Sequence, residues 1–221
     1  GSDVLVDELF VDWIQELERK GRAPSTIHGY RTTYKVNIQP YLGRLAVRKV
    51  TTKHLTDLYG AHQKRGLKPA TVYQVHATLS SMFTQACKWG WRDANPAQWA
   101  DPPSRPILVP VIPTAAQVTA LIEAARSSRR PEYARAIFIA ATTGVRRGEL
   151  CAIRIGRDID VEAKSLTVRH SIVDLPNRPV GEEPTKNRRV RPVALDEFTL
   201  KMIAAQHEML AKRAADAGVA L

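Results

Sequence analysis

Apolar residues recur every three or four positions through most of the first hundred residues, which is the period of an amphipathic α-helix. The pattern predicts four helices: one over 4–20 and three more that begin near residues 24, 52 and 69. The expected buried positions are Val6, Leu9, Phe10, Trp13, Ile14, Leu17, then Ile27, Tyr30, Tyr34, Ile38, Tyr41, then Leu55, Leu58, Tyr59, and finally Val72, Val75, Leu79, Met82 and Ala86. Ser25 is expected to cap the second helix, and the third helix is expected to follow Thr51 and Thr52. Short links between the helices predict a compact bundle.

Six prolines fall between residues 95 and 113 and separate this bundle from the rest of the chain. Proline lacks the backbone donor that a helix or a central strand needs, so we expect an extended, semi-rigid linker. The predicted organisation is therefore a helical domain over 3–94, a linker over 95–113 and a second domain over 114–221.

The second domain begins with helices and then changes its period. Thr114 and Gln117 form a capping-box pattern ahead of Val118, Leu121 and Ile122, which predicts a helix start.

Apolar and polar residues alternate over 166–172, which predicts a strand. A turn-rich run over 174–184 follows, and 185–195 is expected to be a loop that leads into a returning strand, with Pro192 at a sheet edge or strand end. A last helix is expected over 196–217. The predicted fold class is mainly α with a small β-hairpin or sheet.

Charge is distributed unevenly along the chain. Twelve lysines and arginines but only one acid, Asp57, lie between residues 21 and 92, an excess equal to the net charge of +11 of the whole chain. Most acids of the first hundred residues lie on the first predicted helix. One basic segment in an otherwise balanced chain indicates an electrostatic footprint for a polyanion, most simply a nucleic-acid backbone. The alternative is a basic solvated surface without a partner.

Other features exclude several classes of protein. No apolar run approaches the ~18 residues of a membrane span, and no signal peptide is visible, so we expect a cytoplasmic protein without membrane association. Cys87 and Cys151 lie on predicted apolar helix faces without metal-ligand spacing, and we expect both to be buried packing residues. We expect no metal and no other cofactor. Gly1 and Ser2 look like the remnant of an expression tag.

Residues 143–150 read Thr-Gly-Val-Arg-Arg-Gly-Glu-Leu between two predicted helices. Gly144 falls where a helix ends in a left-handed residue, so the chain is expected to turn sharply and present Arg146 at the lip of two packed helices. A guanidinium there can bind two oxygens of one phosphate. Glu149, on the same helical face, either orients Arg146 or forms a plain ion pair with it. The alternative is an ordinary solvated helix start.

The string T-G-V-R-R-G-E-L resembles the first arginine box of the tyrosine recombinase, or phage integrase, family. The match places the family's catalytic arginine on Arg146 and not on Arg147. Strings in the first hundred residues, such as L-G-R-L-A-V-R-K-V-T-T-K-H-L, resemble the core-site-binding domain of that family. T-K-N-R-R-V-R-P-V-A-L resembles its hairpin, which places the general-acid lysine on Lys186. The resemblance implies a four-helix core-binding domain followed by an incomplete mixed α+β catalytic domain.

The chemistry implied by the resemblance is phosphoryl transfer without a cofactor. A tyrosine attacks a DNA phosphodiester and forms a 3′-phosphotyrosine link, while fixed donors stabilise the charge on the phosphate oxygens. Arg146 would be one such donor, and Lys186 would protonate the departing 5′-oxygen. The implied partners are double-stranded DNA at an attachment-site core and further copies of the protein, in a bacterial host. The implied phosphate-facing residues are Arg22, Arg31, Lys35, Lys53, Lys64, Arg65, Lys68, Arg188 and Arg189.

The chain departs from the family pattern after Lys186. It contains one later histidine, His207, and no tyrosine there, because all six tyrosines precede Arg146. An H-x-x-R string at 28–31 lies in the first domain and is interpreted as chance. We therefore expect a truncated recombinase that binds DNA without cleaving it.

Two alternatives from other classes remain at this point. The first is a non-catalytic DNA-binding regulator or accessory factor derived from a recombinase. The second, a helix-turn-helix repressor, explains the basic helices but leaves the proline-rich linker and the hairpin without a purpose.

Overall fold

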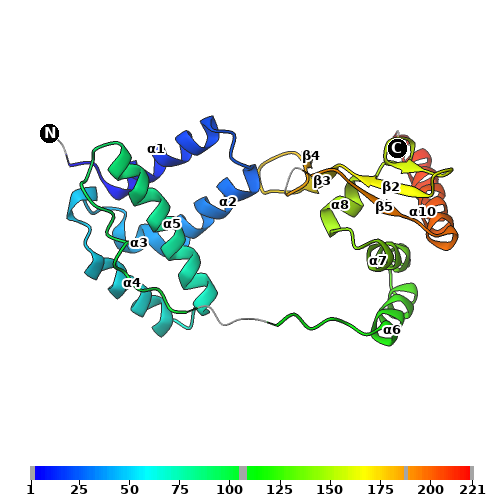
Figure 1. Ribbon diagram of the computed structural model, residues 1–221, viewed down its shortest axis with the longest axis horizontal. Coiled ribbons are helices and arrows are strands. Elements are labelled where there is room, and N and C mark those ends of the chain that lie inside the picture. Colours follow the sequence, from blue (N-terminus) through cyan, green and yellow to red (C-terminus); the bar gives the residue numbers. More distant parts are fainter. Residues whose placement is uncertain (1–2, 105–108, 187–188, 220–221) are drawn as a thin grey trace. The chain divides into compact units, whose positions relative to one another are not determined.

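A computed structural model describes residues 3–104, 109–186 and 189–219. The chain folds into two compact units, Gly1–Val109 and Pro110–Leu221. Figure 1 shows that the first unit is helical and that the second combines helices with short strands. The fold is mainly α with small antiparallel sheets, which confirms the predicted fold class. Within the described ranges, no helix is both long and apolar enough to cross a membrane.

The first unit is built around one long helix, α5, which contacts α1, α2, η1 and α4 (Figure 1). The elements of this unit are α1 (Val6–Arg19), α2 (Pro24–Thr33), the π-helical turn η1 (Tyr34–Ile38), α3 (Gln39–Leu42), the 3-10 turn η2 (Val47–Lys49), α4 (Thr52–Lys64) and α5 (Pro69–Lys88). Val72, Val75, Leu79 and Met82 of α5 are completely buried, as their helical spacing predicted.

Two local predictions in this unit are wrong. Ser25 does not cap α2, because Ala23 occupies the cap position and Pro24 takes the first helical position, where its missing N–H costs nothing. Tyr41 is 40% exposed, whereas Leu42 is buried. The π-helical turn η1 holds one more residue per turn than an α-helix, so the position that faces the core shifts from Tyr41 to Leu42.

Pro40 follows the π-helical turn and explains it, because proline cannot donate to the carbonyl four residues earlier. The wider turn leaves the Asn37 carbonyl to another donor. His62 of α4, which is completely buried, donates from Nε2 to that carbonyl at 2.8 Å. Among the described residues, none forms a hydrogen bond with Nδ1 of His62. His62 is therefore a structural residue of the core.

Residues 95–100, at the start of the proline-rich segment, contribute to the core of the first unit. The Asn95 amide donates to the Ser80 carbonyl and to the Thr84 hydroxyl, both at 2.9 Å. The Thr52 hydroxyl donates to the Pro96 carbonyl at 3.0 Å. Ala97 and Ala100 are buried in the same core.

The second unit contains five helices and five short strands in its described part. They are α6 (Ala115–Arg126), α7 (Glu132–Thr143), α8 (Arg147–Ala152), α9 (Ile155–Asp158), β1 (Ile159–Asp160), β2 (Ser165–Val168), β3 (His170–Val173), β4 (Gly181–Pro184), β5 (Arg191–Ala194) and α10 (Glu197–Asp216). The antiparallel strands form one sheet in the order β1-β2-β5 and a separate hairpin, β3-β4. Ile139, Leu166, Val168 and Ile203 lie in a core between α7, α10 and the three-stranded sheet.

The prediction of one strand over 166–172 is wrong, because the chain breaks at Arg169 into β2 and β3, which belong to different sheets. Strand β4 lies within the run that the sequence assigned to turns. Its composition, Gly-Glu-Glu-Pro, is poor in strand-forming residues, so pairing with β3 decides its structure. Pro192 lies opposite Thr167 on the edge strand β5, as predicted.

Helix α6 begins as predicted, but its apolar face is not buried. The Gln117 amide donates to the Thr114 hydroxyl at 3.3 Å, and the Thr114 amide donates to the Gln117 side chain at 2.9 Å. Leu121 is nevertheless 55% exposed. The cysteine prediction is also wrong in part, since Cys151 is exposed and Cys87 only half-buried.

Candidate functional site

The turn between α7 and α8 presents Arg146 as the sequence predicted. Gly144 ends α7 with φ +64°, a left-handed conformation that glycine adopts without steric cost. The next residue, Val145, is buried in the core of the second unit. Arg146 then occupies the N-cap position of α8. The buried valine anchors the turn, so the backbone of Arg146 is fixed while its side chain remains 60% exposed.

Glu149 is the centre of the interactions around Arg146. Its side chain is 1% exposed, and its Oε2 accepts the backbone N–H of Arg146 at 2.9 Å. Its Oε1 accepts from Nη1 of Arg146 at 2.8 Å. Arg191, at the start of β5, donates Nη1 to Oε1 at 3.2 Å and Nη2 to Oε2 at 2.9 Å. One buried carboxylate thus joins two guanidinium groups from distant parts of the sequence.

This arrangement keeps Glu149 ionised. Hydrogen bonds from Arg191 are the largest cause of a pKa lowered to about 2; burial opposes the shift, and the bonds from Arg146 add to it. Glu149 in turn raises the pKa of Arg191. The carboxylate therefore carries its negative charge at any physiological pH and holds both cations in place.

A close backbone approach fixes α8 against the β3-β4 hairpin. A Cβ atom added to Gly148 would lie 2.9 Å from the carbonyl oxygen of Ile172 and in closer contact with the Ser171 hydroxyl. Only glycine leaves room for this contact. The second glycine of the arginine box therefore positions the hairpin next to Arg146 and Glu149.

The segment after the hairpin carries the predicted lysine. Lys186 and Arg189 are exposed, whereas Arg188 lies outside the described residues. Thr185 is buried, and its hydroxyl donates to the Arg189 carbonyl at 2.9 Å, which closes the loop around Lys186. No contact between Lys186 and Arg146 is found in the part of the chain that the structure describes.

A second ionic cluster holds the hairpin to α9. Asp158, whose side chain is 3% exposed, accepts two bonds from Arg157, from Nε at 2.9 Å and from Nη2 at 2.8 Å. The same Nη2 donates to Glu182 of β4 at 2.6 Å. The hydrogen bond from Arg157 is the largest cause of the lowered pKa of Glu182. Burial by itself would raise the pKa of Asp158, but the hydrogen bonds from Arg157 and from the Arg154 backbone together outweigh burial, and the pKa is lowered. The strand that leads to Lys186 is therefore fixed at its base.

Sequence reasoning missed Arg191 as a member of the site. The 42 positions that separate Arg191 from Glu149 leave no local pattern that would pair the two residues. Only the antiparallel pairing of β2 with β5, which places Arg191 opposite Val168, brings the two residues together.

The basic residues predicted to face phosphates in the first unit are exposed, but they differ in what they contact. Arg31 donates to Glu18 at 2.8 Å, Lys53 to Asp57 at 2.6 Å, and Arg65 to the Tyr41 hydroxyl at 3.0 Å. For the remaining four, no ion pair occurs among the described residues; they are Arg22, Lys35, Lys64 and Lys68.

Arg92 belongs to the same basic segment but has a structural role. Its Nη1 donates to the Val47 carbonyl at 2.9 Å and to the Val50 carbonyl at 3.1 Å, and its Nη2 donates to Val50 at 3.1 Å. Its guanidinium carbon lies 5.0 Å from the centre of the Phe83 ring. Arg92 therefore contributes to the fold, and its charge is only partly available to a partner.

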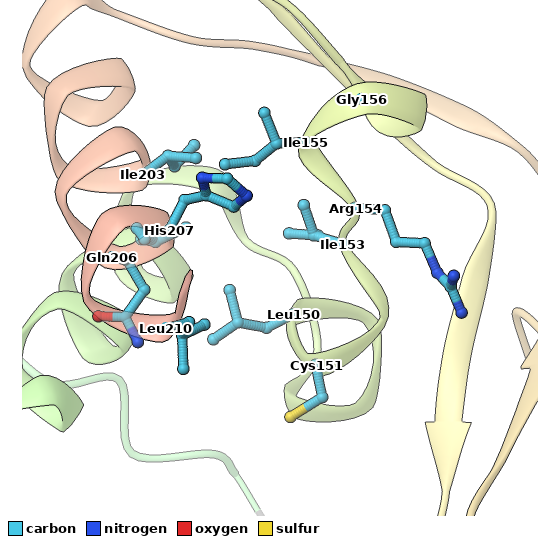
Figure 2. A pocket seen from close by; sticks show the side chains of 11 residues that line it. Leu150, Cys151, Ile153, Arg154, Ile155, Gly156, Ile203, Gln206, His207 and Leu210 are labelled. Carbon is cyan, nitrogen blue, oxygen red and sulfur yellow. The ribbon is translucent and has the colours of Figure 1, made fainter. Parts of the chain in front are cut away.

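The second unit also has an apolar groove of about 500 Å³. Figure 2 shows that Leu150 and Ile153 face His207 and Leu210 of α10 across it, while Arg154 points away. His207, the one histidine after Lys186, lines this groove, and no contact between it and Arg146 is found among the described residues. Aliphatic walls do not suit a phosphate, so the groove is separate from the candidate site. In the described ranges, no group of three or more metal-ligating side chains occurs.

The chain is similar to known proteins over most of its length. Residues 6–101 match the family described as phage integrase central domain. The chain is 28% identical to an integrase of Saccharopolyspora erythraea over 156 residues, which cover 70% of this chain and 35% of the relative. It is 25% identical to a XerC-like tyrosine recombinase of Caldanaerobacter subterraneus over 182 residues, covering 77% of this chain and 44% of the relative.

Solved structures share the fold. The Tn1549 transposon integrase in complex with transposon right end DNA superposes with a TM-score of 0.77 and 19% identity, over 91% of this chain and 64% of the other. A lambda integrase tetramer bound to a Holliday junction gives 0.67 and 22%, over 84% of this chain and 50% of the other. The chain thus spans less than half the length of the curated relatives, at 35% and 44%.

Proposed function

We propose, since the chain belongs to the tyrosine recombinase family, that it acts in site-specific DNA recombination. In this proposal the first unit binds duplex DNA at the core of an attachment site, and the second unit binds the phosphate at which strands are exchanged. The reaction joins the phosphate to a tyrosine and later to a new strand, and so serves integration or excision of a phage or prophage genome in the cytoplasm of a bacterial host.

The observation that carries the proposal is the arrangement of Arg146, Glu149 and Arg191. Arg146 is held by its backbone and by one side-chain nitrogen; its remaining N–H donors have no hydrogen-bond partner among the described residues and can bind an oxyanion. A donor that is fixed before the substrate arrives stabilises the charge that develops on a phosphate in the transition state. We assign Arg146 the role of phosphate ligand and Glu149 that of its orienting residue.

We assign Lys186 the role of general acid, on the resemblance of its segment to the hairpin of the family. Its exposed side chain follows a strand that is fixed at its base by the Arg157–Glu182 contact. An ammonium group on such a loop can reach the 5′-oxygen that leaves when the phosphodiester is cleaved.

No tyrosine follows Arg146 in the 221 residues, and we therefore propose that this chain by itself binds DNA without forming the covalent link. The relatives in the solved structures are bound to DNA, one as a dimer on a core site and one as a tetramer on a Holliday junction. By analogy we propose that copies of the longer protein assemble on DNA.

DNA binding is tested with the chain as it is, by electrophoretic mobility shift of a duplex at several salt concentrations. We expect the affinity to fall steeply as salt increases, because each phosphate contact releases counterions. Single changes of Arg22, Lys35 or Lys64 to alanine each lower the salt slope by about 1 if the residue contacts a phosphate. Undetectable binding, or binding that salt does not weaken, contradicts the proposed DNA-binding role.

Catalysis is tested with a longer protein that contains this chain and continues through a tyrosine. The protein is incubated with a duplex that carries its attachment site, and a covalent adduct is sought on a denaturing gel. We expect an adduct that disappears in the Arg146→Ala variant. Binding without any adduct would favour the alternative, a non-catalytic DNA-binding regulator or accessory factor derived from a recombinase.

A further inference from the structure

We propose that Arg191 is a positioning residue, which serves as the permanent counterion of Glu149 and thereby leaves Arg146 free to bind a phosphate. The inference rests on the proposed function, because it concerns the same phosphate site. It assigns different roles to two arginines that contact one carboxylate.

The contacts of the two arginines with Glu149 are unequal. Arg191 uses two nitrogens, one on each carboxylate oxygen, at 3.2 and 2.9 Å. Arg146 uses one side-chain nitrogen, at 2.8 Å. The Arg191 side chain is 36% exposed and that of Arg146 60%. Arg191 thus has the fork-to-fork geometry of a lasting ion pair, and Arg146 keeps most of its donors toward solvent.

Removal of Arg191 would change what Arg146 does. Glu149 is almost fully buried, and a buried carboxylate needs a cation and satisfied oxygens. Among the described residues, Arg146 is the other side chain that donates to it. We expect Arg146 to turn onto both oxygens of Glu149 when Arg191 is absent, which uses the donors that a phosphate would need.

Arg191 also connects the two proposed catalytic residues. It begins β5, and the loop that precedes it carries Lys186 and is closed by the bond from Thr185 to Arg189. Its Nη2 further approaches the Gly144 carbonyl at 3.5 Å. The lysine segment and the arginine box are therefore joined through one side chain.

The test is a double-mutant cycle on duplex binding by the whole chain. We expect Arg146→Ala to weaken binding about tenfold in the native background, as for the loss of one charged hydrogen bond. In the Arg191→Gln background, the same change should alter binding less than about twofold. Adding Glu149→Gln to Arg191→Gln should restore the effect of Arg146→Ala, because no carboxylate remains to capture Arg146. If Arg191 only stabilises the fold, adding Glu149→Gln should not restore the effect of Arg146→Ala on binding.

Arg169→Gln is the matched control. It removes a guanidinium that lies 3.6 Å from another buried carboxylate, that of Asp158, and should leave the effect of Arg146→Ala unchanged. An equal effect of Arg146→Ala with and without Arg191 overturns the proposal. Circular dichroism confirms that each variant is folded before its binding is compared.

A crystal structure of the Arg191→Gln variant tests the inference without DNA. We expect two nitrogens of Arg146 on Glu149; Arg146 with its single contact unchanged would overturn the proposal. If Arg146→Ala does not affect DNA binding in the native background, the proposed role of Arg146 on DNA fails, and the crystal structure still decides the role of Arg191.

Discussion

Arg92 offers a strong test of the distinction between structural and DNA-facing charges in the first unit. Its guanidinium donates to the carbonyls of Val47 and Val50, two residues that are 1% exposed. A hydrogen bond to a charged group contributes about 1.5–3 kcal/mol, and a buried carbonyl without a donor is costly. With the lower value for each of the two carbonyls, we expect Arg92→Ala to lower the free energy of unfolding of the first unit by about 3 kcal/mol.

The assay uses the distribution of tryptophan. All four tryptophans, Trp13, Trp89, Trp91 and Trp99, lie in the first unit, so their fluorescence during urea unfolding reports on that unit alone. Arg92→Lys keeps the charge but loses the planar fork, and we expect it to lose at least half of the stabilisation.

Arg44→Ala removes an exposed arginine and should change the stability of the first unit by less than about 0.5 kcal/mol. Arg92 is a DNA-facing charge instead if Arg92→Ala lowers the free energy of unfolding by less than about 1 kcal/mol and also lowers the salt slope of DNA binding by about 1.

Three further predictions concern single residues. Gly148→Ala should destabilise the second unit by about 2 kcal/mol, because the added Cβ meets the backbone of β3. Gly144→Ala should destabilise it by about 1 kcal/mol, because only the left-handed backbone conformation opposes the added Cβ. Far-UV circular dichroism during urea unfolding measures both effects. Burial lowers the pKa of His62, so the first unit should lose stability as the pH falls below about 6.5, the ordinary value, and His62→Gln should reduce that loss in fluorescence-monitored unfolding. Cys151 is exposed and should react with iodoacetamide faster than Cys87 by mass spectrometry; equal rates would contradict the described exposure.

The sequence pattern was sufficient to predict those elements whose structure depends only on residues close together in the sequence. The periodic faces of α1, α4 and α5 and the glycine turn at Gly144 follow from the spacing of apolar residues and from the steric freedom of glycine. The capping box at Thr114 is equally local. These elements could be predicted from stretches of about ten residues.

The remaining features depend on partners that are distant in sequence. Strand β4 forms because β3 offers its edge, although Gly181 and Pro184 are poor strand residues. The bond between Arg191 and Glu149 requires β5 to pair with β2 first. Arg146, Glu149 and Lys186 could therefore be proposed from the sequence, whereas Arg191, which we propose to position Arg146, could not.

The π-helical turn over Tyr34–Ile38 has a consequence for how the chain length of relatives can vary. A π-helical turn is one residue longer than an α-helical turn, so loss of a single residue there would restore an unbroken α-helix and keep the residues after it on the same face. Leu42 would then stay in the core, and the donor that His62 supplies to Asn37 would no longer be needed. We expect relatives with a one-residue deletion at this point to have an apolar side chain in place of His62.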